Sequence, residues 1–297
     1  MFHYTSIVLL ILIIITFYSI VELSIKLSIK LTPLEDTVSP PVVKIVIITQ
    51  TKDSADFLGE WIWFYQLQGI DKIILLDNSN NEDISREIEK FGSFVERIPS
   101  TWNGRVSAQH LDIRRIILER ISEIDFLLHI DDDEFIASPT NTIRDLAEIV
   151  DKRGDIAQLG FCWRNVGTQG LKTLTGSTLL SARRMQPLDE TRRCDRWHRK
   201  SMLNLKFANQ TFWTNSLELG IQGDIVHGFG FKETVTNILD FRTYHVARSY
   251  EHLERRVSTW NRSSGALTTT KKQKNAVKVK DRNDVSDDIL FNLASHI

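Results

Sequence analysis

Short apolar runs alternate with helical patterns along the sequence from residue 42 onward. The runs typical of buried strands span 44–49, 72–76, 93–98, 126–130 and 156–163. Strands that alternate with helices favour βαβ units, in which helices connect neighbouring parallel strands and cover the sheet. We therefore predict an α/β fold with a largely parallel sheet flanked by helices.

The helical stretches carry start and stop signals. Asp53 or Ser54 can cap the first helix, and Gly69 can end it in a left-handed conformation. Its apolar stripe consists of Phe57, Leu58, Trp61, Ile62 and Tyr65. Further helices are predicted over 82–90, 107–121 and 141–152.

The apolar run 126–130 leads directly into four consecutive acids, Asp131, Asp132, Asp133 and Glu134. Carboxylates between two buried segments lose water and repel one another unless a cation compensates them. On an extended strand end, Asp131 and Asp133 would share one face, while Asp132 and Glu134 share the other. The Asp-x-Asp pair is therefore a candidate site for Mg2+ or Mn2+ and a substrate's phosphates. An acidic turn that caps the next segment is the alternative.

Polar residues follow the other predicted strands. Thr49-Gln50-Thr51, Asp77-Asn78-Ser79 and the acids fall at carboxyl ends of strands, where open sheets bind ligands. On its own, the second group would be an ordinary turn. The segment 165–170, with Gly167 and Gly170, is either a close approach to a ligand or a plain hairpin turn. The basic stretch 181–200 is either a flap that meets phosphates or a solvated loop.

Composition limits the classes of function. With 297 residues and 42% hydrophobic content, the chain can bury one main core. A net charge of −1 gives no electrostatic reason to propose a nucleic-acid partner. Cys162 and Cys194 lack the paired spacing of metal ligands, so they indicate neither a zinc site nor a disulfide framework.

The N-terminal region is almost continuously apolar over 7–20, and the stretch extends to Leu23. We expect a short N-terminal segment (1–6), a transmembrane anchor (7–23), a stem (24–41) and a basic, solvated C-terminal tail (266–297). A cleaved signal peptide is disfavoured, because no basic leading region and no small-residue cleavage pattern are present. Lys26 and Lys30 favour a cytosolic catalytic part, but so few charges leave a lumenal orientation open.

Over 44–257 the chain resembles glycosyltransferases of the GT-A fold, in their family-2-like and family-92-like branch. The strongest matches are TKDSADFLGEWIWFYQLQGIDKIILLDNS, GRVSAQ and FLLHIDDDEFI, in the order that this branch shows. Weaker matches follow in CWRNVGTQG, RKSML, His227-Gly228 and TYHVARSYEHLERRV. The resemblance implies a GT-A glycosyltransferase domain over 42–265, with a Rossmann-like, mixed but mainly parallel sheet flanked by helices.

By this resemblance, Asp77 would bind the nucleoside of a sugar nucleotide, and Asp131 with Asp133 would hold Mn2+ or Mg2+ against its diphosphate. His245 matches a late histidine of the family and would complete the metal shell or touch phosphate. Further donor-binding candidates are Thr49, Thr51, Arg105, Gln109 and Asp132. Candidates beside the metal or the acceptor are Glu134, Trp163, Gly167 and His227.

The resemblance is incomplete at the first strand, where an Asn-Glu pair is usual and this chain has Lys-Asp-Ser over 52–54. The base and ribose contacts therefore stay open. Without the resemblance, His245 would be interpreted as a structural histidine, and Arg105 and Gln109 as surface residues at the start of a helix.

The predicted function is that of a membrane-anchored, metal-dependent glycosyltransferase, with inversion at the transferred sugar. Such a transfer needs a carboxylate that takes the proton of the acceptor hydroxyl, and Asp189, Glu190 and Asp224 are candidates. The acceptor would be a glycan, a glycoprotein or a lipid-linked molecule. A nucleotidyltransferase is an alternative, although no Gly-rich basic loop follows the first strand; a catalytically inactive, anchored interaction module is another.

Overall fold

The computed structural model describes residues 43–52, 54–79, 83–100, 106–174, 176–182, 184–185, 199–207, 235–236, 238–252, 254 and 285–294. Its strands are β1 (Ile45–Thr51), β2 (Lys72–Asp77), β3 (Val95–Pro99), β4 (Phe126–His129), β5 (Glu134–Ala137), β6 (Gln158–Val166), β7 (Arg184–Met185), β8 (Arg199–Asn204), β9 (Val235–Thr236), β10 (Arg242–Val246) and β11 (Val285–Ser286). Its α-helices are α2 (Ala55–Leu67), α3 (Asp83–Glu89), α4 (Val106–Arg120), α5 (Ile143–Arg153), α6 (Thr178–Ser181) and α11 (Ile289–Ala294). Short 3-10 turns span Gly92–Phe94, Ile121–Glu123, Leu205–Phe207 and Ile238–Asp240.

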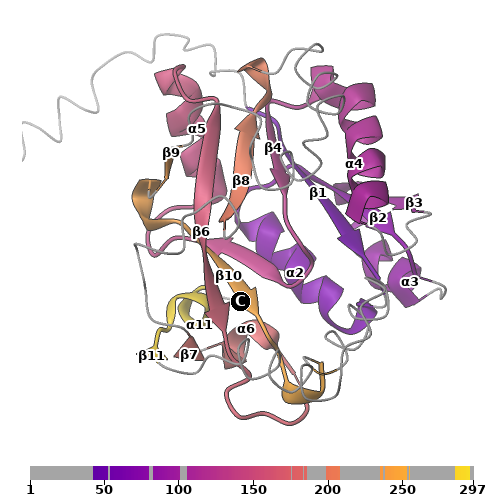
Figure 1. The fold of residues 1–297 in the computed structure, drawn as a ribbon, viewed down its shortest axis with the longest axis vertical. Coiled ribbons are helices and arrows are strands. Elements are labelled where there is room, and N and C mark those ends of the chain that lie inside the picture. Colours follow the sequence, from indigo (N-terminus) through magenta and orange to yellow (C-terminus); the bar gives the residue numbers. More distant parts are fainter. Residues whose placement is uncertain are drawn as a thin grey trace, which may run out of the picture. The chain divides into compact units, whose positions relative to one another are not determined.

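The first half of the sheet is parallel, in the order β3-β2-β1-β4 (Figure 1). Beyond β4 the sheet becomes mixed: β8 is antiparallel to both β4 and β6. Strand β10 runs parallel to β6 and antiparallel to β5. The predicted α/β fold with a mixed, mainly parallel sheet is confirmed: β1 to β4 are parallel, β9 and β10 run parallel to β6, and β8 is antiparallel to both of its neighbours.

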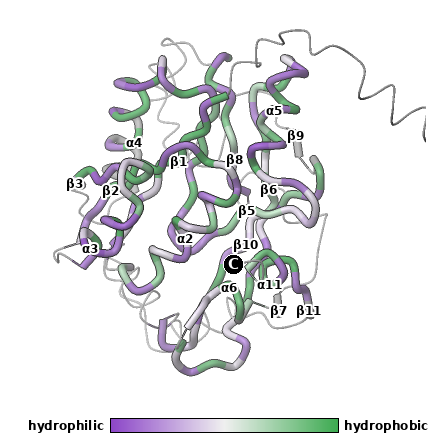
Figure 2. The backbone as a smooth tube through the Cα atoms, turned by 180° about the vertical axis from the view of Figure 1, so that it is seen from behind, coloured by the Kyte–Doolittle hydropathy of each residue, from purple (hydrophilic) through white to green (hydrophobic). Residues whose placement is uncertain are grey.

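Helices cover both faces of the parallel half of the sheet. Alternate residues of β1 point to opposite faces, so β1 contributes side chains to a core on each side. Ile45 and Ile47 belong to one apolar core, together with residues of α2, α3 and α5. Val46 and Ile48 belong to a second core with residues of α4. Figure 2 shows hydrophobic and hydrophilic segments alternating along α4 and α5, as expected for helices with one face on a sheet.

Local signals explain the helix boundaries. Helix α2 ends before Gly69, whose φ of +76° is the predicted left-handed stop. Ser54 stands at the N-cap position of α2, but its hydroxyl donates to the Lys52 carbonyl and makes no cap to the helix. Helix α5 begins with a capping box, in which Thr142 and Asp145 bond each other's backbone amides.

The segment 285–294 differs from the predicted solvated tail. Strand β11 pairs antiparallel with β7, and Leu290 and Ala294 of α11 are buried in the larger core. Asp287 forms an ion pair with Arg164 of β6, and both side chains are largely buried. The expectation of a solvated tail is therefore wrong for 285–294, because apolar side chains at helical spacing pack against the rest of the chain.

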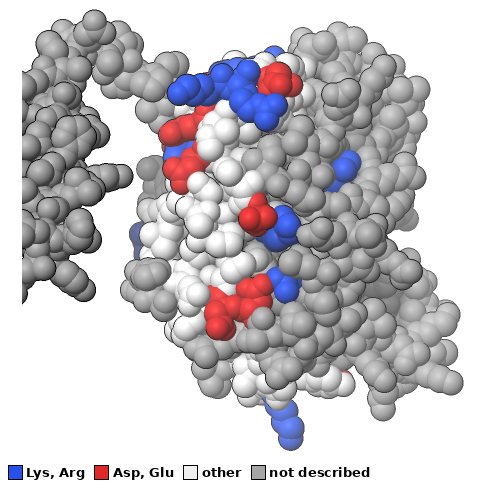
Figure 3. Space-filling view, turned by 90° about the vertical axis from the view of Figure 1, so that its left-hand side faces the viewer, with Lys and Arg blue, Asp and Glu red and all other residues white. Residues whose placement is uncertain are grey.

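Two further expectations concern the N-terminal anchor and the cysteines. No helix among the described residues has the length and apolar character needed to cross a membrane, and the predicted anchor over 7–23 lies outside those residues. Cys162 of β6 is disulfide-bonded, contrary to expectation; the only other cysteine, Cys194, lies outside the described residues. On the face in Figure 3, acidic and basic side chains of the described residues lie beside one another in small groups.

Candidate active site

The four acids form a turn between β4 and β5 rather than an extended strand end. Glu134 N donates to Asp131 O at 3.1 Å, which closes the turn, and Asp131 N donates to Glu134 Oε2 at 2.9 Å. The chain reversal places the Asp131 and Glu134 side chains together, so the predicted sharing of one face by Asp131 and Asp133 is wrong. Strand alternation does not apply to residues that reverse the chain direction.

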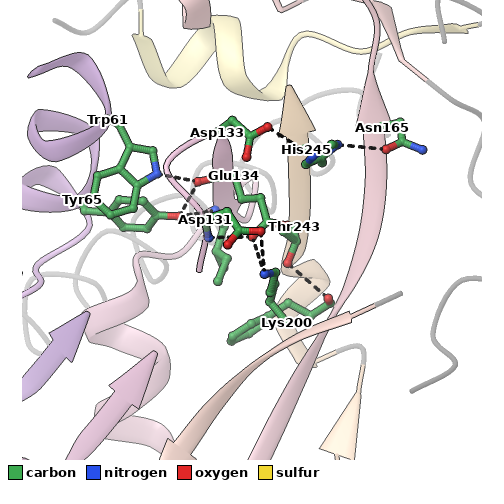
Figure 4. Close-up of polar contacts among 11 residues, drawn as sticks. Trp61, Tyr65, Asp131, Asp133, Glu134, Asn165, Lys200, Thr243 and His245 are labelled. Atoms are coloured by element: carbon green, nitrogen blue, oxygen red, sulfur yellow. Dashed lines mark hydrogen bonds and ion pairs between the residues drawn. The ribbon is translucent and has the colours of Figure 1, made fainter. Parts of the chain in front are cut away.

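Lys200 of β8 compensates the paired acids (Figure 4). Its Nζ lies 3.1 Å from Asp131 Oδ2 and 3.0 Å from Glu134 Oε2, and its side chain is only 2% exposed. Burial alone lowers the pKa of Lys200, but Asp131 and Glu134 together raise it above its usual value. Burial raises the pKa of Glu134, and Lys200 offsets only part of that shift. Lys200 is thus a buried ammonium held by two carboxylates, not part of a solvated loop as the alternative interpretation of 181–200 had it.

His245 of β10 faces Asp133, with Nε2 3.2 Å from Asp133 Oδ2. On the other side of the ring, Nδ1 lies 3.2 Å from Asn165 Oδ1, which accepts its proton. In the neutral tautomer, this bond leaves the lone pair of Nε2 facing a carboxylate oxygen. That contact is attractive if His245 is charged, if Asp133 is protonated, or if a cation lies between the two atoms. The Trp163 ring stacks on the imidazole, with centroids 5.1 Å apart.

Two side chains of α2 form hydrogen bonds with the edge of β5 that faces away from β10. Strand β5 pairs with β10, and Val246 N donates to Asp133 O in that ladder. The antiparallel register then turns the Glu134 carbonyl and the Ile136 amide away from β10. Trp61 Nε1 and Tyr65 Oη donate to that carbonyl at 2.9 and 3.0 Å, and Ile136 N donates to Tyr65 Oη at 2.9 Å.

Asp132 lies between β1 and the segment after β10. Thr51 Oγ1 donates to Asp132 Oδ2 at 2.8 Å, which links the carboxyl end of β1 to the turn after β4. Arg248 Nη2 donates to Asp132 O at 2.6 Å, and its guanidinium lies 4.2 Å from the centre of the Phe57 ring. Arg248 has a left-handed φ of 63°, and burial lowers its pKa to about 10. Strands β1 and β4 adjoin where the strand order reverses, which is where open sheets bind ligands.

Asp77 stands at the end of β2, in register with Thr51. Its Oδ2 accepts from Arg97 Nε at 2.7 Å, and its Oδ1 accepts from Ser79 N at 2.8 Å. Its side chain is fully buried in these contacts. A role of Asp77 in nucleoside binding stays a prediction, and a nucleoside would have to reach this carboxylate past Arg97 and Ser79, which already bind it.

The remaining predicted residues are distributed as follows. Thr49 is buried within β1, and Gly167 follows β6, where its carbonyl accepts from Gln169. Gln109 belongs to α4, but its side chain lies outside the described structure. Arg105, Asp189, Glu190, Asp224 and His227 also lie outside it. Thus Asp131, Asp133, Glu134, His245 and Trp163 are brought together, with Thr51 and Asp132 beside them.

The predicted list missed four residues of this site: Lys200, Arg248, Trp61 and Tyr65. The signal for Lys200 was its position at the start of the apolar run KSMLNL, in a chain with four adjacent acids to balance. Trp61 and Tyr65 had been predicted as core residues of α2, and they are buried. No sequence pattern indicated that their polar atoms reach the turn.

The donor set suits one divalent cation in part. Among the described residues, no three His, Cys, Asp or Glu side chains converge closely enough to hold a metal ion. Asp133 Oδ2 and His245 Nε2 do have a suitable separation of 3.2 Å, since two ligands at right angles around Mg2+ lie about 3 Å apart. Glu134 Oε1 is buried without a hydrogen-bond partner. Asp131, the third predicted ligand, instead contacts Lys200.

No protein-family model and no curated protein sequence matches the chain. Similar solved structures include mannosyl-3-phosphoglycerate synthase from Rubrobacter xylanophilus, with 14% identity and a TM-score of 0.38, covering 77% of this chain and 78% of that one. Glucosyl-3-phosphoglycerate synthase from Mycobacterium tuberculosis, in complex with Mn2+, uridine diphosphate and glucosyl-3-phosphoglycerate, has 11% identity, a TM-score of 0.34 and coverages of 76% and 82%. A cytidylyltransferase from Leptospira borgpetersenii has 12% identity, a TM-score of 0.35 and coverages of 82% and 98%. At these scores, the activity has to be argued from the chain's own residues.

Proposed function

We propose that the chain is a metal-dependent glycosyltransferase of the GT-A type, which moves a sugar from a nucleotide donor to a hydroxyl of a glycan, glycoprotein or lipid-linked acceptor. Transfer would proceed with inversion at the sugar carbon. The apolar segment 7–23 would anchor the protein in a membrane, an expectation that rests on the sequence. The cation would be Mn2+ or Mg2+.

The arrangement of Asp133 and His245 is the observation that carries this proposal. A carboxylate oxygen and an imidazole nitrogen lie 3.2 Å apart beside the acidic turn, and the proton on the far ring nitrogen is accounted for by Asn165. Asp133 is next in sequence to Asp132, which Thr51 at the carboxyl end of β1 binds, and His245 belongs to β10, which pairs with β5 and β6. A site for a cation and an anionic leaving group at a strand-end crevice suits a nucleotide-sugar donor.

Each residue of the site has a separate task in this proposal. Asp133 and His245 would hold the cation, and Asn165 would orient the imidazole by accepting from Nδ1. A bound cation would neutralise negative charge that develops on the departing diphosphate. Thr51 and Arg248 fix the neighbouring part of the turn by binding Asp132. The residue that takes the proton from the acceptor remains to be chosen among Asp189, Glu190 and Asp224.

The test uses the purified full chain with a panel of UDP-, GDP- and TDP-sugars, in Mn2+, Mg2+ or EDTA, and measures released nucleoside diphosphate. We expect hydrolysis of at least one donor with metal, and a loss of about 10²-fold or more in Asp133→Asn, because the variant lacks the ionised ligand. Asp155→Asn is the matched control. Asp155 is an exposed carboxylate that pairs with Arg153, so its variant should keep full activity.

Two outcomes would reject the proposal. Release of pyrophosphate from a nucleoside triphosphate and a sugar 1-phosphate, without donor hydrolysis, would favour the nucleotidyltransferase. Hydrolysis of no donor with any metal, by a chain that unfolds cooperatively, would favour the inactive interaction module. Equal activity of Asp133→Asn and Asp155→Asn would remove the assigned role of Asp133.

A further inference from the structure

Lys200 occupies a position that few lysines in proteins have. It lies on β8 between β4 and β6, in register with Phe161, and its side chain is 2% exposed. Lysine is rarely buried unless it is paired, because removing an ammonium from water is costly. Here the cost is offset by Asp131 Oδ2 at 3.1 Å and Glu134 Oε2 at 3.0 Å. The ammonium is therefore fixed by the acidic turn.

One of the two carboxylates that hold Lys200 is also a predicted metal ligand. Asp131 cannot give the same oxygen fully to an ammonium and to a divalent ion, because both are cations and repel each other at short range. The negative charge of the acidic turn can only partly compensate both the ammonium and a divalent ion. Asp131, Asp133 and Glu134 carry three negative charges when ionised, and Lys200 already neutralises one of them.

The surroundings of Lys200 allow it to stay buried while its contact with Asp131 weakens. Glu134 Oε2 would remain its partner, and Glu134 Oε1 is a buried acceptor without a hydrogen-bond partner. The Trp163 ring also lies near, with its centroid 5.9 Å from Nζ. An aromatic face attracts a cation at this range. Lys200 thus has alternative contacts within reach.

We propose that Lys200 is a positioning residue that competes with a divalent cation for Asp131. In the absence of metal, its ammonium holds Asp131 against Glu134 and keeps the acidic turn closed. A cation first binds through Asp133 and His245, and gains Asp131 only by displacing the ammonium. Lys200 therefore weakens the binding of metal alone. The inference rests on the proposed function in its choice of cation, but its test needs no nucleotide sugar.

The test measures Mn2+ binding to the full chain from the electron paramagnetic resonance signal of free Mn2+, without nucleotide. Lys200→Met removes the competing charge and keeps most of the apolar stem. We expect it to bind Mn2+ about tenfold more tightly or better than wild type, since Asp131 then has no ammonium partner and its carboxylate is available to the ion. Lys200→Arg, which retains the charge, should bind like wild type. The control Lys206→Met removes an exposed lysine that pairs with Asp151, and it should change nothing.

A purely structural role of Lys200 predicts the opposite result, because a disturbed turn would bind Mn2+ more weakly. Equal or weaker binding by Lys200→Met would therefore overturn the proposal, as would the absence of binding in both proteins. If tighter binding is seen, adding Asp131→Asn to Lys200→Met should abolish the gain, since the competition acts through Asp131. A gain that persists in the double variant would contradict this route.

A second comparison applies even if Lys200→Met does not fold. With Lys200 in place, Asp131→Asn should lower Mn2+ affinity by less than about threefold, whereas Asp133→Asn should lower it about tenfold or more. Equal losses in the two variants would overturn the proposal, because Asp131 would then be as fully engaged with the cation as Asp133. Donor hydrolysis decides the proposed function separately, so Mn2+ binding without turnover would reject that function and leave this inference standing.

Discussion

The Tyr65 hydroxyl holds two backbone groups at the edge of β5, and its removal tests whether α2 supports the acidic turn. Tyr65 Oη donates to Glu134 O and accepts from Ile136 N, at 3.0 and 2.9 Å. In Tyr65→Phe the Ile136 amide loses its partner in a buried position. The Glu134 carbonyl keeps one donor, Trp61 Nε1, at 2.9 Å.

The expected cost follows from this difference. A buried amide without a partner costs about 1–3 kcal/mol, and the loss of one bond to a carbonyl that keeps another donor costs about 1 kcal/mol or less. We therefore expect Tyr65→Phe to lower the free energy of unfolding by about 1–4 kcal/mol. Trp61→Phe leaves the carbonyl with Tyr65, so its cost comes mainly from lost packing, about 1–3 kcal/mol.

The double variant separates these effects, because only there does the Glu134 carbonyl lose both donors. Its destabilisation should exceed the sum of the single values by about 1 kcal/mol or more. Urea unfolding at pH 7, followed by fluorescence and circular dichroism, gives the three values. Tyr250→Phe is the control, since Tyr250 is 42% exposed. Additivity within about 0.3 kcal/mol would refute the shared-carbonyl argument.

Two further predictions concern parts of the chain away from the site. The hydrogen bonds of Arg120, with help from Lys72 and against partial burial, lower the pKa of Glu96 from 4.5 to about 2. Glu96→Gln should therefore lower the free energy of unfolding by about 1 kcal/mol above pH 4.5, after allowance for solvent screening. This loss should fade as the pH falls from 4.5 towards 2, and acid unfolding curves measure it. A loss that does not depend on pH would contradict the ion-pair explanation. Leu290→Ala should cost about 2–4 kcal/mol in urea unfolding, because Leu290 is fully buried, whereas a cost below about 0.5 kcal/mol would restore the solvated tail.

The parts of the fold that follow simple periodicity could be predicted from the sequence. Strands β1 and β2 are continuous apolar runs, since both faces of a parallel strand are covered by helices. Strand β10 could not be recognised in this way, because its sequence RTYHV places Arg242, Thr243 and His245 in buried positions. Those side chains are tolerated through contacts from distant segments. Thr243 Oγ1, for example, donates to the Phe161 carbonyl at 3.2 Å.

The same limit applies to the site. Asp133 and His245 lie side by side although 112 positions separate them in the sequence, and only the family resemblance had suggested that they belong to one site. Their role as metal ligands stays a prediction. The partner of Asp131 was missed, because Lys200 belongs to a basic stretch that has the composition of a loop. Local composition describes the average environment of a segment. It does not identify the single lysine that a strand carries into the interior.

The four acids can stand next to one another because the turn distributes them among three partners, Thr51, Lys200 and His245. Asp132 accepts from Thr51, while Asp131 and Glu134 share Lys200. Asp133 faces an imidazole whose other nitrogen donates to Asn165. A straight strand would have placed two carboxylates on each face, about 7 Å apart, with no such division of partners. The proposed cation would therefore meet the turn first at Asp133 and His245, because Asp131 and Glu134 already contact Lys200 and Asp132 accepts from Thr51.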